Sequence, residues 1–225
     1  MGAAEPLLET VWGVLTTEPS TGVGVLTIDG DVLYVNAQAA KIFHGPDAKP
    51  EDYIGRNWAD HMPEDWTRER LAMLRRIRIS GKPILLRNIW RGCQHFTYIY
   101  PVPRDDDGPD LFLTITRRAE TESQAEELAK GDYEWLDAQV ANLGPLDVLS
   151  DRELEVLALL GQGLSIKEIA RLLFRSEHTI VSHRKAIGAK LGVDDRVKLA
   201  LIARRAGLTI RDVDLHRVAS GASSH

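Results

Sequence analysis

The sequence lacks several features that would each assign it to a particular class of protein. Its 225 residues contain one cysteine, Cys93, so no internal disulfide can form, and such a composition fits a reducing cytoplasm. No apolar run approaches the roughly 18–20 residues of a membrane-spanning helix. Residues 1–6 carry no basic n-region, which argues against a signal peptide. We therefore expect a cytoplasmic protein that does not contact a membrane.

Motifs of catalysis and of metal binding are also missing. No Ser/His/Asp grouping, pair of catalytic carboxylates or phosphate-cradling glycine loop stands out. The N-terminal half does not alternate strands and helices as a phosphorylated receiver domain would. His44, His61 and His95 are scattered, and the pair Cys93/His95 alone is a weak metal signal. We predict that the protein is not an enzyme and holds no metal, and we leave its cofactor unassigned.

What is present is typical of a two-domain globular protein with unequal charge. Apolar residues make up 44% of the chain and charged residues 27%, and the length suffices for two ordinary domains. Residues 146–225 hold 13 Lys and Arg against 10 Asp and Glu, a balance of +3, whereas residues 1–145 have a balance of −8. This asymmetry is expected when one half contacts phosphate and the other does not.

Three serines in the C-terminal third occur where short helices are expected to begin. Ser150 and Ser165 are each followed three residues later by glutamate, which is the pattern of a capping box. Ser176 begins a third segment, 177–191, after a connection of only about three residues. Two short helices joined by so tight a turn are typical of a helix-turn-helix, and DNA is therefore the first partner to consider.

The N-terminal part predicts an α+β domain with a five-stranded antiparallel sheet. The Asp29-Gly30 pair forms a hairpin turn between the first two strands, and Asn36 caps the helix that follows. In the next-to-last strand, Phe96, Tyr98 and Tyr100 share one face. The strands are expected at 23–28, 32–35, 84–90, 95–102 and 111–116, with helices at 37–43 and 63–80 between the second and third strands.

Residues between the two domains have apolar side chains at roughly helical spacing, although Gly131 interrupts them. We expect a connecting helix there that could self-associate. The predicted organisation is a helical segment at 1–19, a sensor or dimerisation domain at 20–118, the connecting helix at 119–145, an all-α four-helix domain at 146–208 and a tail at 209–225.

Both domains resemble known families. The blocks Leu149–Glu153, Gly161–Ser165, Lys167–Ala170, Thr179–His183 and Lys190–Val193, in this order, closely resemble the LuxR-type helix-turn-helix domain. That resemblance implies a bacterial transcription regulator whose third helix enters the major groove and whose fourth often supports dimerisation. Less specifically, residues 20–118 resemble a PAS sensor domain, which implies sensing of a small molecule, redox state or light, or dimerisation alone.

Two specialised PAS chemistries lose their key residue in this chain. Light-sensing flavin relatives have a cysteine where this sequence has Trp58 after Gly55-Arg56-Asn57. Haem-binding oxygen sensors resemble the stretch after Met62, but Arg70 stands in the place of their iron-ligating histidine. Core packing is the preferred interpretation, over a ligand cage, for Trp58, Trp66, Trp90 and the tyrosine row. Whether the domain binds an apolar or aromatic ligand, or no ligand at all, stays open.

The third helix of the helix-turn-helix divides into a buried and an exposed face. At 100° per residue, Ile180, Ile187 and Leu191 form a buried stripe. Short polar, cationic and small side chains on the opposite face suit a helix pressed into a groove. Lys185 is the strongest candidate for contact with guanine O6 and N7. The predicted base contacts are His178, Val181, Ser182 and Lys185, the alternative being a solvated face.

Five further residues are candidates for phosphate contact, which fixes register and adds salt-dependent affinity. They are Lys167, Ser176, Thr179, Lys190 and Arg196. Two alternatives stay open: Ser176 caps its helix and does no more, or Lys190 forms a salt bridge within the domain. His183 and Arg184 point inward on the same wheel. Many family members have lysine at the position of Val181, so the target sequence cannot be taken from relatives.

These observations lead to the hypothesis of a sequence-specific DNA-binding regulator whose PAS-like domain senses a signal or mediates dimerisation. The implied partners are double-stranded DNA, a second copy of the chain, RNA polymerase and a small-molecule ligand. Two recognition helices in a dimer would contact half-sites about 10 bp apart. The alternatives are a PAS-mediated protein-interaction module with weak DNA binding, and a sigma-like factor.

Overall fold

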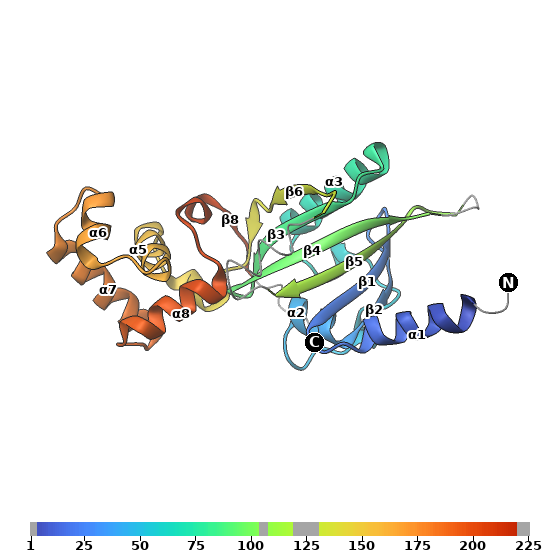
Figure 1. Ribbon diagram of the computed structural model, residues 1–225, viewed down its shortest axis with the longest axis horizontal. Helices are drawn as coiled ribbons and strands as arrows, with labels where there is room; N and C mark the ends of the chain where they lie inside the picture. The colour runs from blue at the N-terminus through green and yellow to red at the C-terminus, as the bar shows by residue number, and fades with distance from the viewer. Residues whose placement is uncertain (1–3, 104–107, 119–130, 220–225) are drawn as a thin grey trace.

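The computed structural model describes residues 4–103, 108–118 and 131–219, which form two domains placed end to end (Figure 1). A sheet with its helices occupies one end of the molecule, and a bundle of short helices occupies the other. The N-terminal helix, α1 (Ala4–Thr17), lies at the end farther from the helical bundle.

The N-terminal domain is built on a sheet with the strand order β2-β1-β5-β4-β3-β6. Its first five strands pair antiparallel, so the predicted α+β domain with a five-stranded antiparallel sheet is confirmed. The sixth strand, β6, joins the edge of β3 in parallel. The strands are β1 (Thr21–Thr27), β2 (Val32–Val35), β3 (Ile84–Trp90), β4 (Cys93–Val102), β5 (Leu111–Arg118) and β6 (Glu134–Asp137).

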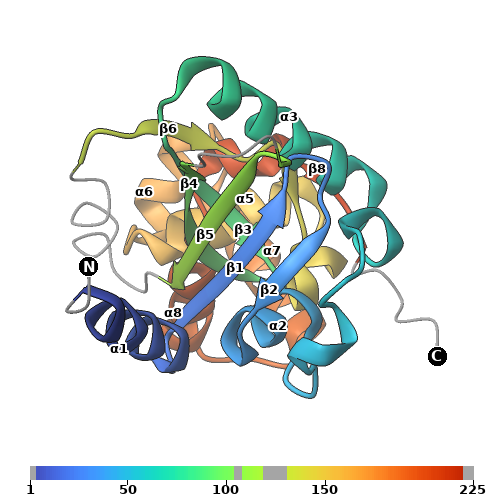
Figure 2. The same ribbon diagram turned by 90° about the vertical axis from the view of Figure 1, so that its right-hand side faces the viewer.

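Helices between β2 and β3 cover one face of this sheet (Figure 2). The amide oxygen of Asn36 accepts a hydrogen bond from the Ala39 backbone N–H at 2.8 Å and so caps the first of them, as predicted. Leu74 and Ile77 of α3 are fully buried and pack against the strands. The helices are α2 (Ala37–His44), η1 (Pro50–Asp52), η2 (Trp58–Asp60) and α3 (Glu64–Ser80).

The prediction of a connecting helix at 119–145 is wrong for the part that the structure describes; residues 119–130 lie outside the described ranges. From Glu134 the chain is extended, because the open edge of β3 supplies backbone partners that a helix would not use. The Glu134 N–H donates to Pro83 O, and the Ala138 N–H donates to Arg87 O, both at 2.9 Å. Among the described apolar residues that gave the helical spacing, Leu136 is half-buried against the core of the sheet and Leu143 is buried in the cluster of the second domain.

The second domain contains the four helices that the sequence predicts, entered through η3 (Gly144–Val148). Leu154 and Leu157 of its first helix and Ile180 and Ile187 of its third are at most 1% exposed, and they form the centre of one apolar cluster. The helices are α5 (Asp151–Gly161), α6 (Ile166–Leu172), α7 (Glu177–Leu191) and α8 (Arg196–Ala206).

The segment predicted as a C-terminal tail returns to the first domain. It forms η4 (Ile210–Asp214) and β8 (His216–Arg217), and β8 pairs in parallel with β7 (Val140–Ala141). The two domains also share apolar packing, since Ile89 of β3 belongs to the same buried cluster as Leu143 and Val213. The entry and the exit of the helical domain therefore lie side by side.

Candidate nucleic-acid interface and internal cavity

The predicted helix caps are formed by side-chain hydrogen bonds. Ser150 and Ser165 each complete a capping box, in which Glu153 and Glu168 accept the serine backbone N–H at 2.8 and 2.7 Å. The Ser176 hydroxyl accepts the Thr179 N–H at 3.1 Å. These caps fix where α5, α6 and α7 begin, and with them the short turn that sets α6 against α7.

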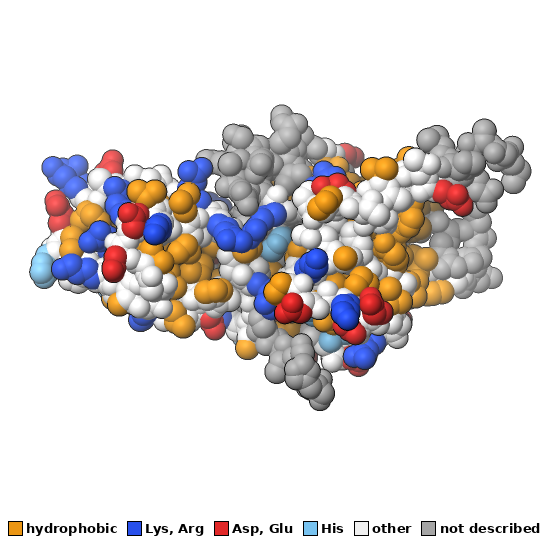
Figure 3. All heavy atoms as spheres, turned by 90° about the horizontal axis from the view of Figure 1, so that it is seen from below, with side chains coloured by type: hydrophobic (Ala, Val, Ile, Leu, Met, Phe, Trp, Pro, Cys, Tyr) orange, Lys and Arg blue, Asp and Glu red, His pale blue; other side chains and the backbone are white. Residues whose placement is uncertain are grey.

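Helix α7 has the two faces that the helical wheel predicts. Ile180 and Ile187 are 0% exposed, and Leu191 is half-buried against the same cluster. His178, Ser182 and Lys185 are exposed on the other side, with Ala189 beside them and Val181 half-buried at the edge. Figure 3 shows Lys, Arg and His side chains over the outer end of this domain, interspersed with acidic ones.

The exposed face of α7 keeps hydrogen-bonding capacity for a partner. The Ser182 hydroxyl donates to His178 O at 3.0 Å, so its oxygen can still accept. Lys185 forms no ion pair or hydrogen bond with any described residue. The ammonium group of Lys185 is therefore available to a ligand at no cost in intramolecular contacts.

The five candidates for phosphate contact differ in how far they are already engaged. Lys167 is exposed on α6, and no described residue pairs with it. The hydroxyls of Ser176 and Thr179 lie 2.8 Å apart at the start of α7. The Lys190 ammonium lies 2.6 Å from the Glu153 carboxylate, and Arg196 donates to Leu164 O at 2.8 Å. For Lys190 this favours the salt bridge within the domain that the sequence left open.

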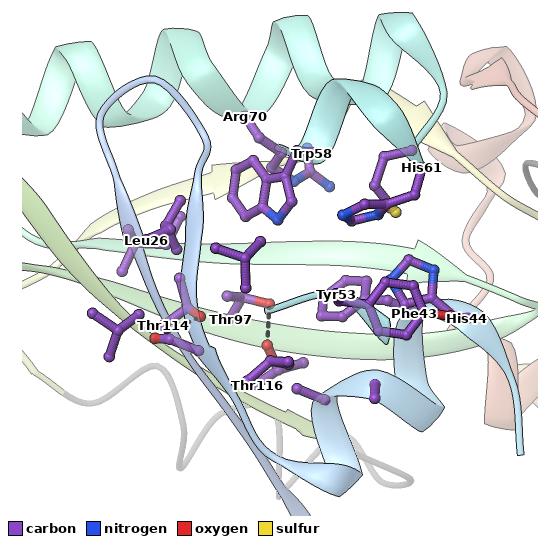
Figure 4. Close-up of a pocket in the computed structure, with 18 of the residues that line it drawn as sticks. Leu26, Phe43, His44, Tyr53, Trp58, His61, Arg70, Thr97, Thr114 and Thr116 are labelled. Carbon is purple, nitrogen blue, oxygen red and sulfur yellow. Dashed lines mark hydrogen bonds between the residues drawn. The ribbon is translucent and has the colours of Figure 1, made fainter. Parts of the chain in front are cut away.

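A cavity of about 70 Å³ lies between the sheet of the first domain and its covering helices (Figure 4). Part of its wall is aromatic, with Tyr53 stacked on His44 at a centroid distance of 3.8 Å and His61 edge-on to both. Trp58 lies edge-on to Trp66 at 5.0 Å. The remaining aromatic residues of the wall are Tyr34 and Phe43.

Polar groups enter the cavity from the strands and from α3. The hydroxyls of Thr97 and Thr116 lie 3.1 Å apart on β4 and β5. On β3, the Asn88 side-chain nitrogen donates to His95 O at 3.2 Å, while its oxygen is buried without a partner among the described residues. Arg70 is 4% exposed, pairs with Glu69 at 2.5 Å and lies 5.0 Å from the ring centroid of Trp66.

Both cavity histidines are held neutral. Burial lowers the pKa of His44 to about 3, and the neighbouring His61 and Arg91 also disfavour a positive charge on its ring. Burial also lowers the pKa of His61, against the charge of Asp60, and neither ring nitrogen of His61 has a hydrogen-bond partner among the described residues. The cavity thus combines aromatic surface, neutral imidazoles and unused hydrogen-bonding atoms.

The sequence did not reveal this cluster. Along the chain the histidines are scattered and Tyr53 does not stand out, because these residues lie on separate short segments that only the fold brings together. Trp58 and Trp66 line the cavity, whereas Trp90 donates from its indole nitrogen to Phe43 O at 2.9 Å. The tyrosine row packs with Tyr133 in a separate cluster. In the sequence, the best available signal of this cavity was Arg70, which stands in the place of the iron-ligating histidine of haem-binding oxygen sensors.

The comparisons of sequence concern mainly the second domain. The model of the luxR family of bacterial regulatory proteins, GerE, matches residues 147–203. The transcriptional regulatory protein LnrK of Bacillus subtilis is 45% identical over 62 residues, which are 28% of this chain and 28% of LnrK. A nitrate/nitrite response regulator protein homolog of Haemophilus influenzae is 35% identical over 106 residues, 43% of this chain and 50% of that protein. The chain therefore spans half or less of these curated relatives.

Solved structures align with both domains at low identity. A Vibrio cholera VqmA–ligand–DNA complex aligns over 97% of this chain and 96% of its own, with 20% identity and a TM-score of 0.49. The PAS domain of Bordetella pertussis BvgS aligns over 54% of this chain and 93% of its own, with 11% identity and a TM-score of 0.39. No described helix of the chain has the length and hydropathy needed to cross a bilayer.

Proposed function

Because residues 147–203 form a helix-turn-helix domain of the LuxR family, we propose that this protein is a sequence-specific DNA-binding transcription regulator acting in the cytoplasm. The observation that carries the proposal is the exposed, uncommitted face of α7. The function includes no catalytic step. RNA polymerase is the partner through which such a regulator would act.

In the proposed complex α7 lies in the major groove. Lys185 donates to guanine O6 and N7, while Ser182 and His178 hydrogen-bond to base edges and Val181 contacts a thymine methyl group. Phosphates are contacted at the N-terminal ends of α6 and α7, where free backbone N–H groups also favour an anion. The contacting side chains are Lys167, Ser176 and Thr179. Lys190 and Arg196 act mainly within the domain, since each already binds an oxygen of its own chain.

The experiment compares wild type with Lys185→Ala on a library of DNA sites. Loss of a base contact is expected to cost about 1–3 kcal/mol on the preferred site and to relax the preference at one position. Lys167→Ala is the matched control, because loss of a phosphate contact weakens all sites alike and lowers the salt slope by about 1. Equal site preferences in wild type and Lys185→Ala would refute the assignment of Lys185.

The first domain is proposed to sense a small neutral ligand in its cavity. Neutral histidines and aromatic walls favour an uncharged, flat molecule, and the buried Asn88 oxygen favours one that donates a hydrogen bond. Exposed apolar side chains on α1 and β2 support association of two copies: Val11 is 55%, Val14 65% and Leu33 48% exposed. Native mass spectrometry of the protein purified from its own host reports the ligand and the number of subunits together.

A further inference from the structure

A second pocket, of about 370 Å³, lies apart from the aromatic cavity, between α2 and the turn that joins β3 to β4. Three of its lining side chains are cationic, namely Lys41, Arg91 and Arg118, and no Asp or Glu is found among its described lining residues. This concentration runs against the balance of −8 that residues 1–145 carry. A pocket so lined raises the local concentration of anions.

Two observations show that polar groups at this pocket lack partners among the described residues. The side chains of Lys41 and Arg91 form no ion pair or hydrogen bond with described residues. His95 is only 5% exposed, and its Nδ1 has no hydrogen-bond partner in the described part of the chain. A buried polar atom left unpaired costs free energy, which a bound ligand would recover. Arg118 contacts the Cys93 sulfur and is held at the same site.

The backbone of Arg91 adds a third, independent observation. The Arg91-Gly92 turn places both residues at positive φ, 51° and 69°, as a type I′ hairpin turn requires. Asparagine or glycine favours that conformation, and arginine carries it at a conformational cost. Its guanidinium lies against Gly45, where an added Cβ would come within 3.2 Å of Nη2. The position is unfavourable for an arginine backbone but directs a cation to the pocket.

We propose that this pocket binds a small anion carrying phosphate or carboxylate groups, with Arg91 and Lys41 as its charged contacts and His95 as a buried hydrogen-bonding partner. The planar guanidinium matches two oxygens of such an anion. The same turn contacts the start of the second domain. The Arg91 N–H donates to the Asn142 side chain at 3.1 Å, and the Gly92 N–H donates to Asn142 O at 3.2 Å. Anion binding is thereby placed beside the junction of the two domains.

The test measures binding of inorganic phosphate by the full chain, by calorimetry and by thermal shift, against sodium chloride at equal ionic strength and pH. Wild type is expected to bind phosphate, and Arg91→Asn to bind it about tenfold or more weakly because a charged hydrogen bond is lost. Asparagine suits the turn, so this variant should be at least as stable as wild type without phosphate. Arg75→Gln, which removes an exposed cation of α3, is the matched control and should bind like wild type.

Malonate in place of phosphate distinguishes a carboxylate from a phosphate ligand, and Lys41→Gln provides a second variant at the pocket. If phosphate acts no more strongly than chloride on wild type, or equally on wild type and Arg91→Asn, the proposal is overturned. Neither result depends on DNA binding, so it leaves the proposed function untouched.

Discussion

The carboxylate of Glu153 accepts hydrogen bonds from two directions. It receives the Ser150 backbone N–H at 2.8 Å, which completes the cap of α5, and the Lys190 ammonium at 2.6 Å from the end of α7. The side chain is only 7% exposed. One residue thus ties the start of the first helix of the helical domain to the end of its third.

Glu153→Ala should therefore destabilise the domain by about 2 kcal/mol, because it removes a cap and leaves Lys190 without its partner. Chemical denaturation measures the effect. Glu177→Ala removes an exposed acid from the first turn of α7 and serves as the control, with a change within about 0.5 kcal/mol. Equal losses in the two variants would contradict the double role of Glu153.

The difference between wild type and Glu153→Ala should depend on pH. Burial acts to raise the pKa of Glu153, but hydrogen bonds from Lys190 and Ser150 outweigh it and lower the pKa. A carboxylate with a lowered folded-state pKa stabilises fully above the unfolded value, about 4.3, and loses this contribution as pH falls through the folded value. The free energies of unfolding of wild type and Glu153→Ala, measured from pH 7 downward, should converge only below about pH 4.

At the level of elements, the prediction from the sequence and the structure differ most clearly at β6, which was expected to be helical. Leu136 is half-buried and packs against the core of the sheet, while the side chain of Asp132 is 95% exposed just before the strand. Arg76 of α3 pairs with Glu134 and so joins the strand to a helix as well as to β3.

Leu136→Ala is expected to destabilise the first domain by about 1–2 kcal/mol, less than a fully buried leucine would, because part of the side chain is already in water. Thermal or denaturant unfolding measures this loss. Asp132→Ala, four residues earlier in the same segment, should change stability by no more than about 0.5 kcal/mol. An effect of Leu136→Ala as small as that of Asp132→Ala would show that β6 contributes nothing to the core.

The elements that the sequence predicted correctly carry their information locally. Ser150, Ser165 and Ser176 cap within three residues, and the Asp29-Gly30 turn and Asn36 act on their immediate neighbours. The helix predicted after Gly131 was wrong because the conformation of that segment depends on the free edge of β3, about fifty residues earlier in the chain. Apolar residues at helical spacing do not distinguish a helix from a strand that is buried by two different partners.

On the scale of the whole molecule, the two domains are joined by a buried ion pair. Arg87 of β3 donates to both carboxylate oxygens of Asp212 at 2.9 Å and to Gly207 O at 2.6 Å. The Arg87 side chain is 13% exposed and that of Asp212 is 4% exposed. Thr209 also donates to Asp212, so the cation and η4 are held in one hydrogen-bonded group.

Arg87→Met should cost about 3–5 kcal/mol, because it leaves the Asp212 carboxylate buried without its cation. The sheet and the helical domain should then unfold in two calorimetric transitions instead of one. Arg117→Met, which removes an exposed arginine of β5, is the control and should keep the wild-type profile. A single transition at the wild-type temperature in Arg87→Met would exclude a coupling role for this ion pair.

The pairing of β7 with β8 also shows that the helical domain extends beyond the boundaries of the family match. The family match ends at residue 203, yet Ala206, Leu208 and Val213 are buried in the same apolar cluster as α5 and α7. The Asn142 side chain further donates to Val218 O at 2.8 Å. A helical domain excised at the family boundaries would therefore expose part of its own core, and a fragment that keeps this packing needs at least the residues from about Val140 to Val218.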